Sequence, residues 1–519
     1  MKKKTLLSLA AASIFSLVLA GCSLDNPFGE ESSASNQSSY TYPITANYTT
    51  TAANDRDSDY FSQVKNNTGM YAGPTKGNAK CLVVPINFAG ESSIYTDTNV
   101  AGIALKEKLN TAFFGTSDST DYWESLSSYY YKSSYSQLAI SGTVTDYINL
   151  TQTYTYYENQ IISDNSDCST FTNQIVQAVL EELIENRGLN YSDYDSDGDG
   201  FIDYMWLVYT CPYNGNESTG LQWAYTYWFY SDSIQSKYDK AYNYSWASKD
   251  FMYEGLDRSN ANGVDAHTYI HETGHQMGLD DYYSYDGSNA RSPLGGTDMM
   301  DNNIVDHNSL SKFDLDWITP TVGEADKTYT LKPFEDSGES LIIANTTTYN
   351  GTPCDEFFIC EYYTPTGLNK LDSTTKYSSI LGLTDSGLRI MHVDQRLGKM
   401  IYSKTSGWSW DLNYYSKPTI DLANTSAYYN FISSNTKKYC YDSTDYALLS
   451  LVQASGKTNL MDPFTSSDGK AINADLFDMD SYVFGRDVVP ATDSGWREPY
   501  VLTISAMNSS GITFTLTSR

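Results

Sequence analysis

The stretch HETGHQMGLDD, residues 271–281, contains side chains whose types and spacing suit a metal ion. On a helix, His271 and His275 lie one turn apart on the same face, so both imidazoles can reach one zinc ion. Glu272, beside the first histidine, is placed to hold a water molecule at the zinc and to take its proton. The spacing therefore predicts two zinc ligands and a general base for hydrolysis.

The residues that follow the helix offer the third ligand that such a site needs. Gly278 can adopt the left-handed conformation that ends a helix and turns the chain sharply. Asp281 comes three residues later, and a carboxylate oxygen binds zinc at about 2.0–2.2 Å. The spacing favours Asp281, and the adjacent Asp280 is the alternative. We therefore expect a site made by two histidines and one aspartate.

Further side chains are candidates for supporting this site. The stretch SPLGGTDMMDNN, residues 292–303, predicts a turn that packs a methionine beneath the metal. Met300 is the expected residue and Met299 the alternative, while the competing interpretation makes both ordinary core residues. His267 is expected to be structural or to support the ligands. His307 is a candidate for stabilising negative charge in the transition state.

A second stretch, YDSDGDGFIDYM at residues 194–205, has the carboxylate spacing of a calcium-binding loop. Acidic residues occupy positions 1, 3, 5 and 9 of the pattern, and Gly200 occupies position 6, where a sharp turn is needed. Position 12 is Trp206 instead of glutamate, so this is a calcium-type loop outside a true EF-hand. The competing interpretation is a solvated acidic turn. The predicted calcium ligands are Asp195, Asp197, Asp199 and Asp203.

The N-terminus predicts export. Three lysines precede a short apolar run that ends in Leu-Ala-Gly-Cys, which is similar to a bacterial lipobox. We expect residues 1–21 to be a lipoprotein signal peptide and Cys22 to carry the lipid. Residues 22–77, rich in Ser, Asn and Thr, are expected to form a flexible tether or a short pro-segment. The protein is then lipid-anchored at the outer face of the bacterial cell membrane, or released from it.

Length and charge limit the other possibilities. A chain of 519 residues predicts two folded domains. The formal net charge of −30 argues against nucleic acid as a partner. The N-terminal lipid is the expected contact with the membrane, and a monomer is expected. Six further cysteines can form disulfides after export, and the sequence leaves their pairing open.

The pattern of apolar residues predicts two regions that differ in secondary structure. Strands and helices alternate over residues 78–320, which predicts an α+β catalytic domain with strands near 81–88 and 201–210 and helices near 171–186 and 267–278. Residues 321–519 instead contain short strands separated by turn residues, which predicts a mainly β, sandwich-like C-terminal domain. His392 lies in one of these strands and is expected to be structural.

These motifs together resemble the immune inhibitor A-type family of secreted bacterial zinc metallopeptidases. HETGHQMGLDDYY is similar to that family's HExxHxxGxxD helix and turn, and YSDYDSDGDGFIDYMWLVY and SLSKFDLDWITP are similar to other parts of its catalytic domain. EFFICEYYTPTGLN and SGLRIMHVDQR are similar to its β-region. The resemblance implies a metzincin-like catalytic fold, with His271, His275 and Asp281 as zinc ligands and Glu272 as the base. The methionine turn departs from the family, because no tryptophan stands beside it.

The expected function is therefore that of a cell-surface zinc endopeptidase that hydrolyses extracellular proteins or peptides, with zinc and calcium as its ions. A thermolysin-like site is the alternative within peptidases and would need a glutamate ligand from a later helix. The alternative from another class is a surface adhesin on a peptidase fold that has lost activity. The sequence does not predict cleavage specificity.

Overall fold

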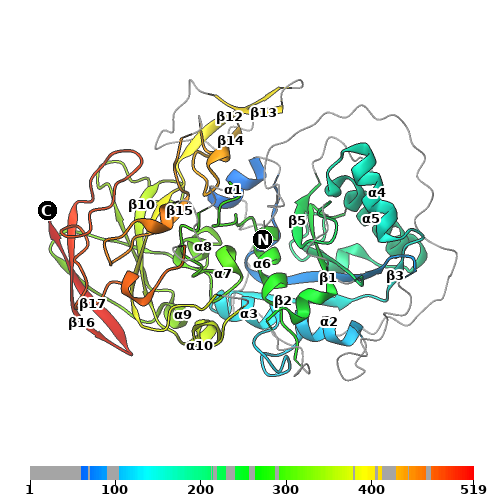
Figure 1. Ribbon diagram of the computed structural model, residues 1–519, viewed down its shortest axis with the longest axis horizontal. Helices are drawn as coiled ribbons and strands as arrows, with labels where there is room; N and C mark the ends of the chain where they lie inside the picture. Colours follow the sequence, from blue (N-terminus) through cyan, green and yellow to red (C-terminus); the bar gives the residue numbers. More distant parts are fainter. Residues whose placement is uncertain are drawn as a thin grey trace.

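The structure is a computed structural model that describes residues 60–67, 70–90, 105–211, 213, 219–229, 240–255, 263–286, 291–377, 380–403, 407–411, 428–441, 444–462 and 469–519. The predicted signal peptide, Cys22 with its predicted lipid and most of the predicted tether lie outside these residues. Over the described part the fold is mixed α/β with several sheets, as the coarse prediction of an α+β protein required (Figure 1).

The first sheet belongs to the N-terminal half and has the strand order β2-β1-β4-β6-β5, with β3 paired to β1. The ladders β1–β2, β1–β3, β1–β4 and β4–β6 are parallel, whereas the edge strand β5 runs antiparallel to β6. Its strands are β1 (Gly77–Asn87), β2 (Leu138–Val144), β3 (Ile148–Asn149), β4 (Tyr204–Tyr209), β5 (Tyr225–Trp228) and β6 (Asn243–Ser248).

Helices cover both faces of this sheet because successive strand residues point to opposite sides. On β1, Leu82 and Val84 face the cluster that contains α4 (Tyr154–Asp164) and α5 (Cys168–Glu181), which a short π-helix (Glu182–Asn186) continues. Cys81 and Val83 face the cluster on the other side. That cluster contains α2 (Leu105–Phe114), α3 (Leu126–Ser133) and α6 (His267–Gln276), and Figure 1 shows α6 at the centre of the molecule.

The C-terminal half is built from three antiparallel or mixed sheets and short helices. The strand orders are β15-β11-β10-β9-β7, β16-β17-β8 and β13-β12-β14. The strands are β7 (Thr321–Val322), β8 (Lys327–Leu331), β9 (Ser340–Ala344), β10 (Glu356–Tyr363), β11 (Gly387–Asp394), β12 (Leu397–Ser403), β13 (Gly407–Trp410), β14 (Tyr428–Phe431), β15 (Leu449–Leu451), β16 (Tyr500–Asn508) and β17 (Gly511–Ser518). The remaining α-helices are α1 (Tyr60–Asn67), α7 (Met299–Asn302), α8 (Ser309–Asp314), α9 (Phe334–Ser337) and α10 (Lys370–Thr374).

Single 3₁₀ turns connect these elements at Tyr191–Tyr194, Lys249–Tyr253, Gly367–Asn369, Lys437–Tyr439, Asn459–Met461 and Asn473–Asp475.

The five-stranded sheet is buried on both faces, and this joins the two halves. Phe358 and Cys360 on β10 pack towards the sheet of β8, β16 and β17, as a sandwich requires. Their neighbours Phe357 and Ile359 belong instead to the cluster that contains α3 and α6. One hydrophobic core thus contains residues from both sides of residue 320. The two predicted regions differ in secondary structure but share this core.

Packed structure also begins earlier than the predicted boundary at residue 78. Phe61 and Val64 on α1 are buried, at 2% and 0% exposure. The ring of Phe61 stacks on Phe431 of β14 with centroids 6.0 Å apart, and Gly73 N donates to Gln276 O at the end of α6, at 2.8 Å. The polar composition of residues 22–77 concealed these few apolar anchors. Residues 60–67 and 70–77 are therefore part of the fold and not of a tether.

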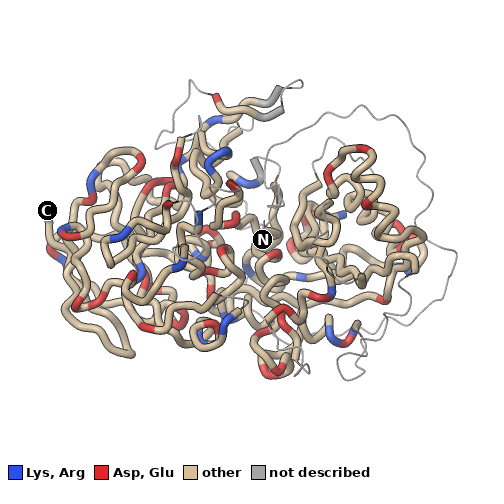
Figure 2. The backbone as a smooth tube through the Cα atoms, in the orientation of Figure 1, with Lys and Arg blue, Asp and Glu red and all other residues tan. Residues whose placement is uncertain are grey.

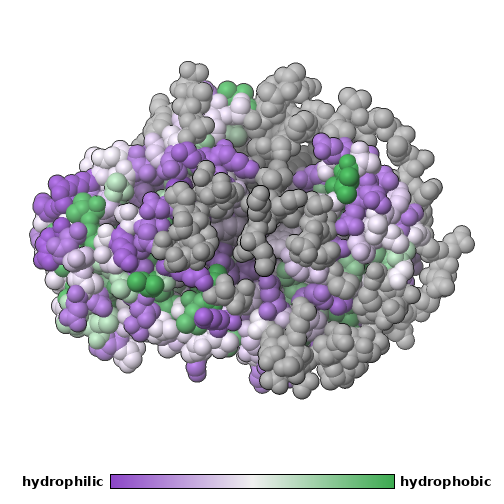
Figure 3. Space-filling view, viewed as in Figure 1, coloured by the Kyte–Doolittle hydropathy of each residue, from purple (hydrophilic) through white to green (hydrophobic). Residues whose placement is uncertain are grey.

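The surface of the described chain is acidic and mixed in polarity. Figure 2 shows Asp and Glu spread over both halves with fewer Lys and Arg between them. On the face drawn in Figure 3, apolar residues form small spots separated by hydrophilic ones. None of the helices in the described ranges has the length and apolar character needed to cross a membrane.

Candidate metal centre

Helix α6 presents His271 and His275 with their ring orientations fixed. The Nδ1 atom of His271 lies 2.8 Å from Met299 O, and the Nδ1 atom of His275 lies 2.7 Å from Leu279 O. A carbonyl oxygen accepts only, so each Nδ1 carries the proton and donates it. In the neutral imidazole each Nε2 then keeps its lone pair, which is the tautomer that binds a metal.

Asp281 completes the group. Its Oδ1 lies 3.0 Å from His271 Nε2 and 3.3 Å from His275 Nε2, and one ligand atom of each of the three residues lies within 4.8 Å of the others. The turn that brings it there passes through Gly278, whose φ is +99°. A side chain at that position would be strained, so the glycine is needed for the aspartate to fold back over the helix.

Asp280, the alternative ligand, points elsewhere. Its Oδ2 lies 2.8 Å from the Nζ atom of Lys65 on α1. The lysine side chain is 4% exposed and that of Asp280 is 30% exposed. The structure thus gives the two adjacent aspartates different partners, and only Asp281 joins the histidines.

The two predicted methionines both support the helix, in different ways. The side chain of Met300 is fully buried, and its Sδ would lie 2.6 Å from a Cβ atom placed on Gly274. A larger residue at position 274 would therefore force this methionine side chain to move. Met299 contributes its carbonyl oxygen to His271, as described above. Short helix α7, which carries both, begins at the N-cap Asp298, whose side chain accepts from Met300 N at 2.7 Å.

Side chains of the C-terminal half make hydrogen bonds to the turn that contains Asp281 and to the segment that leads into Met299 and Met300. The Nδ2 atom of Asn435 donates to Tyr282 O at 2.6 Å, next to the ligand Asp281. In the five-stranded sheet, Arg389 Nη1 donates to Thr297 O at 2.6 Å, and its Nε donates to Glu361 at 2.8 Å. Both side chains of this ion pair are nearly inaccessible, at 4% and 0% exposure. The five-stranded sheet is thus connected to the segment that begins the methionine turn.

The electrostatics of the group favour a positive charge. Burial alone would lower the pKa of His275, but the carboxylate of Asp281 outweighs it and raises that pKa to about 9. The pKa of His271 is also raised, by the hydrogen bond and charge of Asp281 acting against burial. Burial acts to raise the pKa of Asp281, but the two imidazoles hold it below its usual range. Burial raises the pKa of Glu272.

These residues fit a zinc ion. Ligand atoms about 2.0–2.1 Å from a tetrahedral zinc lie roughly 3.3–3.4 Å from one another, close to the two distances measured between Asp281 and the imidazoles. Two imidazoles and a carboxylate are a donor set that zinc accepts. The raised pKa values mean that without a metal the two imidazoles tend to hold an extra proton. A divalent cation would take the place of that positive charge.

The other histidines lie outside this group. His267 is fully buried, with Nδ1 2.5 Å from Asp265 Oδ1 and its ring stacked on Trp123 at 4.0 Å, a structural role as expected. His307 has no exposed surface and lies among aromatic rings, including that of Tyr130 at 5.9 Å. The prediction that His307 stabilises charge on a substrate is therefore wrong, because no substrate atom can reach it.

His392 belongs to a buried polar cluster with Glu356 and Asp493 whose atoms lie within 4.8 Å of one another. The carboxylate of Glu356 is already surrounded by donors. His392 Nε2 lies 2.9 Å from Oε1, while Ser494 N and Trp496 Nε1 each donate to Oε2 at 3.1 Å. This cluster attaches the loop at residue 494 to β10 and β11, which agrees with a structural role.

The acidic loop brings together three of its four predicted ligands. Ligand atoms of Asp195, Asp197 and Asp199 lie within 4.8 Å of one another, and the loop curls so that Gly198 N and Gly200 N donate to Asp195 at 2.7 and 2.9 Å. Three carboxylates so close repel one another, and a calcium ion would compensate them.

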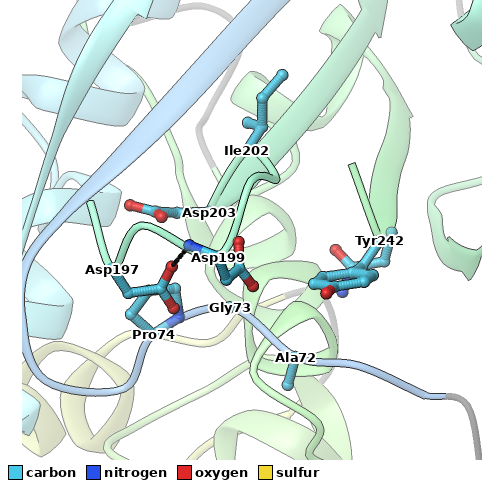
Figure 4. A pocket seen from close by; sticks show the side chains of 9 residues that line it. Ala72, Gly73, Pro74, Asp197, Asp199, Ile202, Asp203 and Tyr242 are labelled. Carbon is cyan, nitrogen blue, oxygen red and sulfur yellow. Dashed lines mark hydrogen bonds between the residues drawn. The ribbon is translucent and has the colours of Figure 1, made fainter. Parts of the chain in front are cut away.

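Asp203 is not in that group, and its role as a fourth calcium ligand stays a prediction. Its carboxylate accepts from Ser196 N at 2.9 Å and from Lys80 N at 2.7 Å, which ties the loop to β1. Burial raises its pKa to about 7. Figure 4 shows the carboxylate of Asp203 pointing away from that of Asp199, although both residues line the same small pocket beside residues 72–74.

Three polar residues at the metal centre were not found from the sequence. Lys65 and Asn435 come from distant segments, and Thr226 lies on the edge strand β5, where its hydroxyl lies 3.1 Å from Glu272 Oε2. No local spacing connects them to the helix. The sequence did contain one sign of these contacts. Gln276 lies one helical turn after Glu272, and its Nε2 donates to Ser245 Oγ.

No family model matches the sequence, and none of the curated proteins matches it.

Proposed function

We propose that this protein is a zinc-dependent endopeptidase that hydrolyses peptide bonds of extracellular proteins. The observation that carries the proposal is the convergence of His271, His275 and Asp281 on one point, with Glu272 on the helix that carries both histidines. A structural zinc site is usually closed by four protein ligands, whereas a catalytic site has three and keeps one position open. Within the described ranges, three protein ligands meet at this point.

The residues of the site have separate tasks in this reaction. His271, His275 and Asp281 hold the zinc, which when bound supplies polarisation of the scissile carbonyl and acidification of a water molecule. Glu272 takes a proton from the attacking water and delivers it to the nitrogen of the leaving amine. Its pKa, raised by burial, suits a group that must both accept and return a proton.

Calcium has a structural part in the proposal. The group formed by Asp195, Asp197 and Asp199 lies on the loop before β4, the central strand that packs against α6. The indole Nε1 of Trp206, on that strand, donates to Thr273 Oγ1 on α6 at 3.0 Å. A calcium ion in the loop would therefore stiffen the support of the zinc helix without taking part in the reaction.

Export and lipid attachment remain proposals from the N-terminal sequence. Residues 1–21 and Cys22 lie outside the described residues. Changing Cys22 to Ala is expected to release the protein from membranes into the medium, as fractionation of cells would measure. Equal membrane association of the two proteins would contradict lipid attachment there.

The test of the function uses a variant that keeps the ligands and removes the base. Changing Glu272 to Gln is expected to leave zinc content unchanged and to abolish cleavage of a mixed peptide library, followed by mass spectrometry. The unaltered protein should cleave the library and lose that activity with a zinc chelator. A protein that binds surfaces but cleaves no peptide would favour the adhesin alternative.

A further inference from the structure

A hydroxyl group from the edge strand of the first sheet contacts the proposed general base. Thr226, on β5, has its Oγ1 3.1 Å from Oε2 of Glu272 and 2.8 Å from the backbone oxygen of the same residue. Both side chains are nearly buried, since Thr226 is 8% exposed and Glu272 is 6% exposed. The contact is therefore made away from bulk water, where a hydrogen bond to a carboxylate is strong.

Thr226 is the last member of a chain of hydrogen bonds. Its Oγ1 lies 2.7 Å from Oγ of Ser245 on β6. Ser245 Oγ in turn accepts from Nε2 of Gln276, at 2.7 Å, and Oε1 of Gln276 accepts from Met205 N on β4, at 3.1 Å. Ser245 and Gln276 have no exposed surface. The chain thus connects the central strand of the sheet to the base.

The donor and acceptor in each of these hydrogen bonds can be assigned from the groups that can only donate. The backbone N–H of Met205 can only donate, so the amide oxygen of Gln276 faces it and the amide nitrogen faces Ser245. Ser245 accepts that hydrogen bond and has one proton of its own to donate. Its Oγ lies 2.7 Å from Thr226 Oγ1 and 3.3 Å from the backbone oxygen of Glu272, so Thr226 is the better acceptor. Thr226, which accepts from Ser245, then directs its single proton to Glu272, where the backbone oxygen at 2.8 Å and Oε2 at 3.1 Å share it, and the charged carboxylate is the stronger acceptor of the two.

We propose that Thr226 is a positioning residue, which holds Oε2 of Glu272 so that Oε1 faces the attacking water. The terminal torsion of a glutamate is broad and prefers no single angle, so a base without such a contact would sample orientations that do not reach the water. The inference rests on the proposed function, because it assigns a partner to the base of that reaction.

The predicted effect is on turnover and not on binding. Thr226→Val keeps the shape of the side chain and removes the hydroxyl, so kcat is expected to fall about 10–100-fold, the usual cost of losing a group that orients a catalytic residue. KM and zinc content are expected to stay unchanged, because Thr226 is not a ligand. Thr226→Ser restores the hydroxyl and is expected to recover most of kcat.

A matched control exists on the opposite face of the same sheet. Thr172, on α5, is fully buried, and its hydroxyl contacts Tyr244 and Tyr225 at 2.6 and 2.9 Å. Thr172→Val therefore removes a buried hydroxyl with two partners without touching Glu272. It is expected to keep the kcat of the unaltered protein even if it lowers thermal stability.

The experiment measures kcat, KM and zinc content for the zinc-loaded full chain on one peptide substrate, for T226V, T226S, T172V and E272Q. The proposal predicts that T226V lowers kcat alone and that T226S and T172V retain it. Unchanged kcat in T226V, an equal loss in T172V, or a rise in KM instead would overturn it.

Two further outcomes are decisive. If T226V does not fold, Ser245→Ala breaks the same chain one position earlier and must lower kcat; an unaltered kcat then refutes the proposal. If the unaltered chain shows no chelator-sensitive cleavage, the proposed function fails and this inference with it. Active protein with an unaffected T226V overturns the inference alone.

Discussion

Adjacent aspartates with different partners allow a sharp test of the metal site. The perturbation is a pair of conservative changes, Asp281→Asn and Asp280→Asn, each of which removes one charge and keeps the shape of the side chain. Asp281 contacts both imidazoles, and Asp280 pairs with Lys65. If the assignment is right, the two variants should differ strongly in zinc affinity although they are neighbours.

The magnitude follows from the number of ligands. Zinc held by four protein ligands contributes roughly 10–16 kcal/mol, or about 3 kcal/mol for each, so losing Asp281 should weaken zinc binding about 100-fold or more. Asp280 is 30% exposed, so its ion pair with Lys65 is partly screened by water and is worth about 1 kcal/mol or less in stability. The zinc Kd of D280N should therefore stay close to that of the unaltered protein.

The assay is competition for zinc against a chromophoric chelator at fixed pH, with circular dichroism to confirm that each variant is folded. A 100-fold weaker Kd in D281N with an unchanged Kd in D280N supports the assignment. The opposite order would move the third ligand to Asp280. Equal, unchanged affinities in both variants would refute the reasoning that three ligands meet on this helix.

Three further predictions concern stability. Arg389→Met leaves Glu361 buried without its partner and should lower the free energy of unfolding by about 3–5 kcal/mol in denaturant titrations; a change below about 1 kcal/mol, the range of exposed pairs, would contradict the burial of the pair. Calcium is expected to raise the melting temperature of the unaltered protein, and changing Asp197 and Asp199 together to Asn should abolish that rise; a rise that persists would exclude this loop as the calcium site. Burial alone would lower the pKa of His267, but two buried aspartates outweigh it and raise that pKa to about 10. The stabilisation from its proton is then complete below about pH 6.5, the unfolded value, and lost as pH rises towards about 10. The difference in unfolding free energy between the unaltered protein and His267→Gln should shrink over that range, and a constant difference would show that the proton is not linked to folding.

The parts of the fold that sequence predicted are those that local spacing controls. Helix α6, its glycine turn and Asp281 lie within 15 residues of chain, from His267 to Asp281, and each step depends on neighbours in sequence. The strands of the C-terminal half could be predicted for the same reason, because alternation of apolar side chains is a local pattern. The methionine turn was predicted from the motif at residues 292–303, which is also a local pattern.

The parts that were not predicted depend on contacts between distant segments. Two domains were expected from the length of the chain and its change of strand pattern, but apolar residues on both faces of β10 do not say that one face packs on the N-terminal half. Phe61 and Val64 are too few to form a pattern, so α1 was assigned to a tether. Asp203 has the right spacing for a calcium ligand, but a backbone N–H from β1 competes for it, and that contact exists only in three dimensions.

The most direct test of the central claim is a zinc titration of metal-stripped protein with peptide cleavage as the readout. We expect that cleavage is absent without metal, returns in proportion to added zinc, and saturates at one zinc per chain bound at His271, His275 and Asp281. Glu272→Gln should bind the same single zinc and stay inactive throughout. Cleavage by the fully stripped protein, or a zinc-loaded E272Q variant as active as the unaltered protein, would contradict the claim.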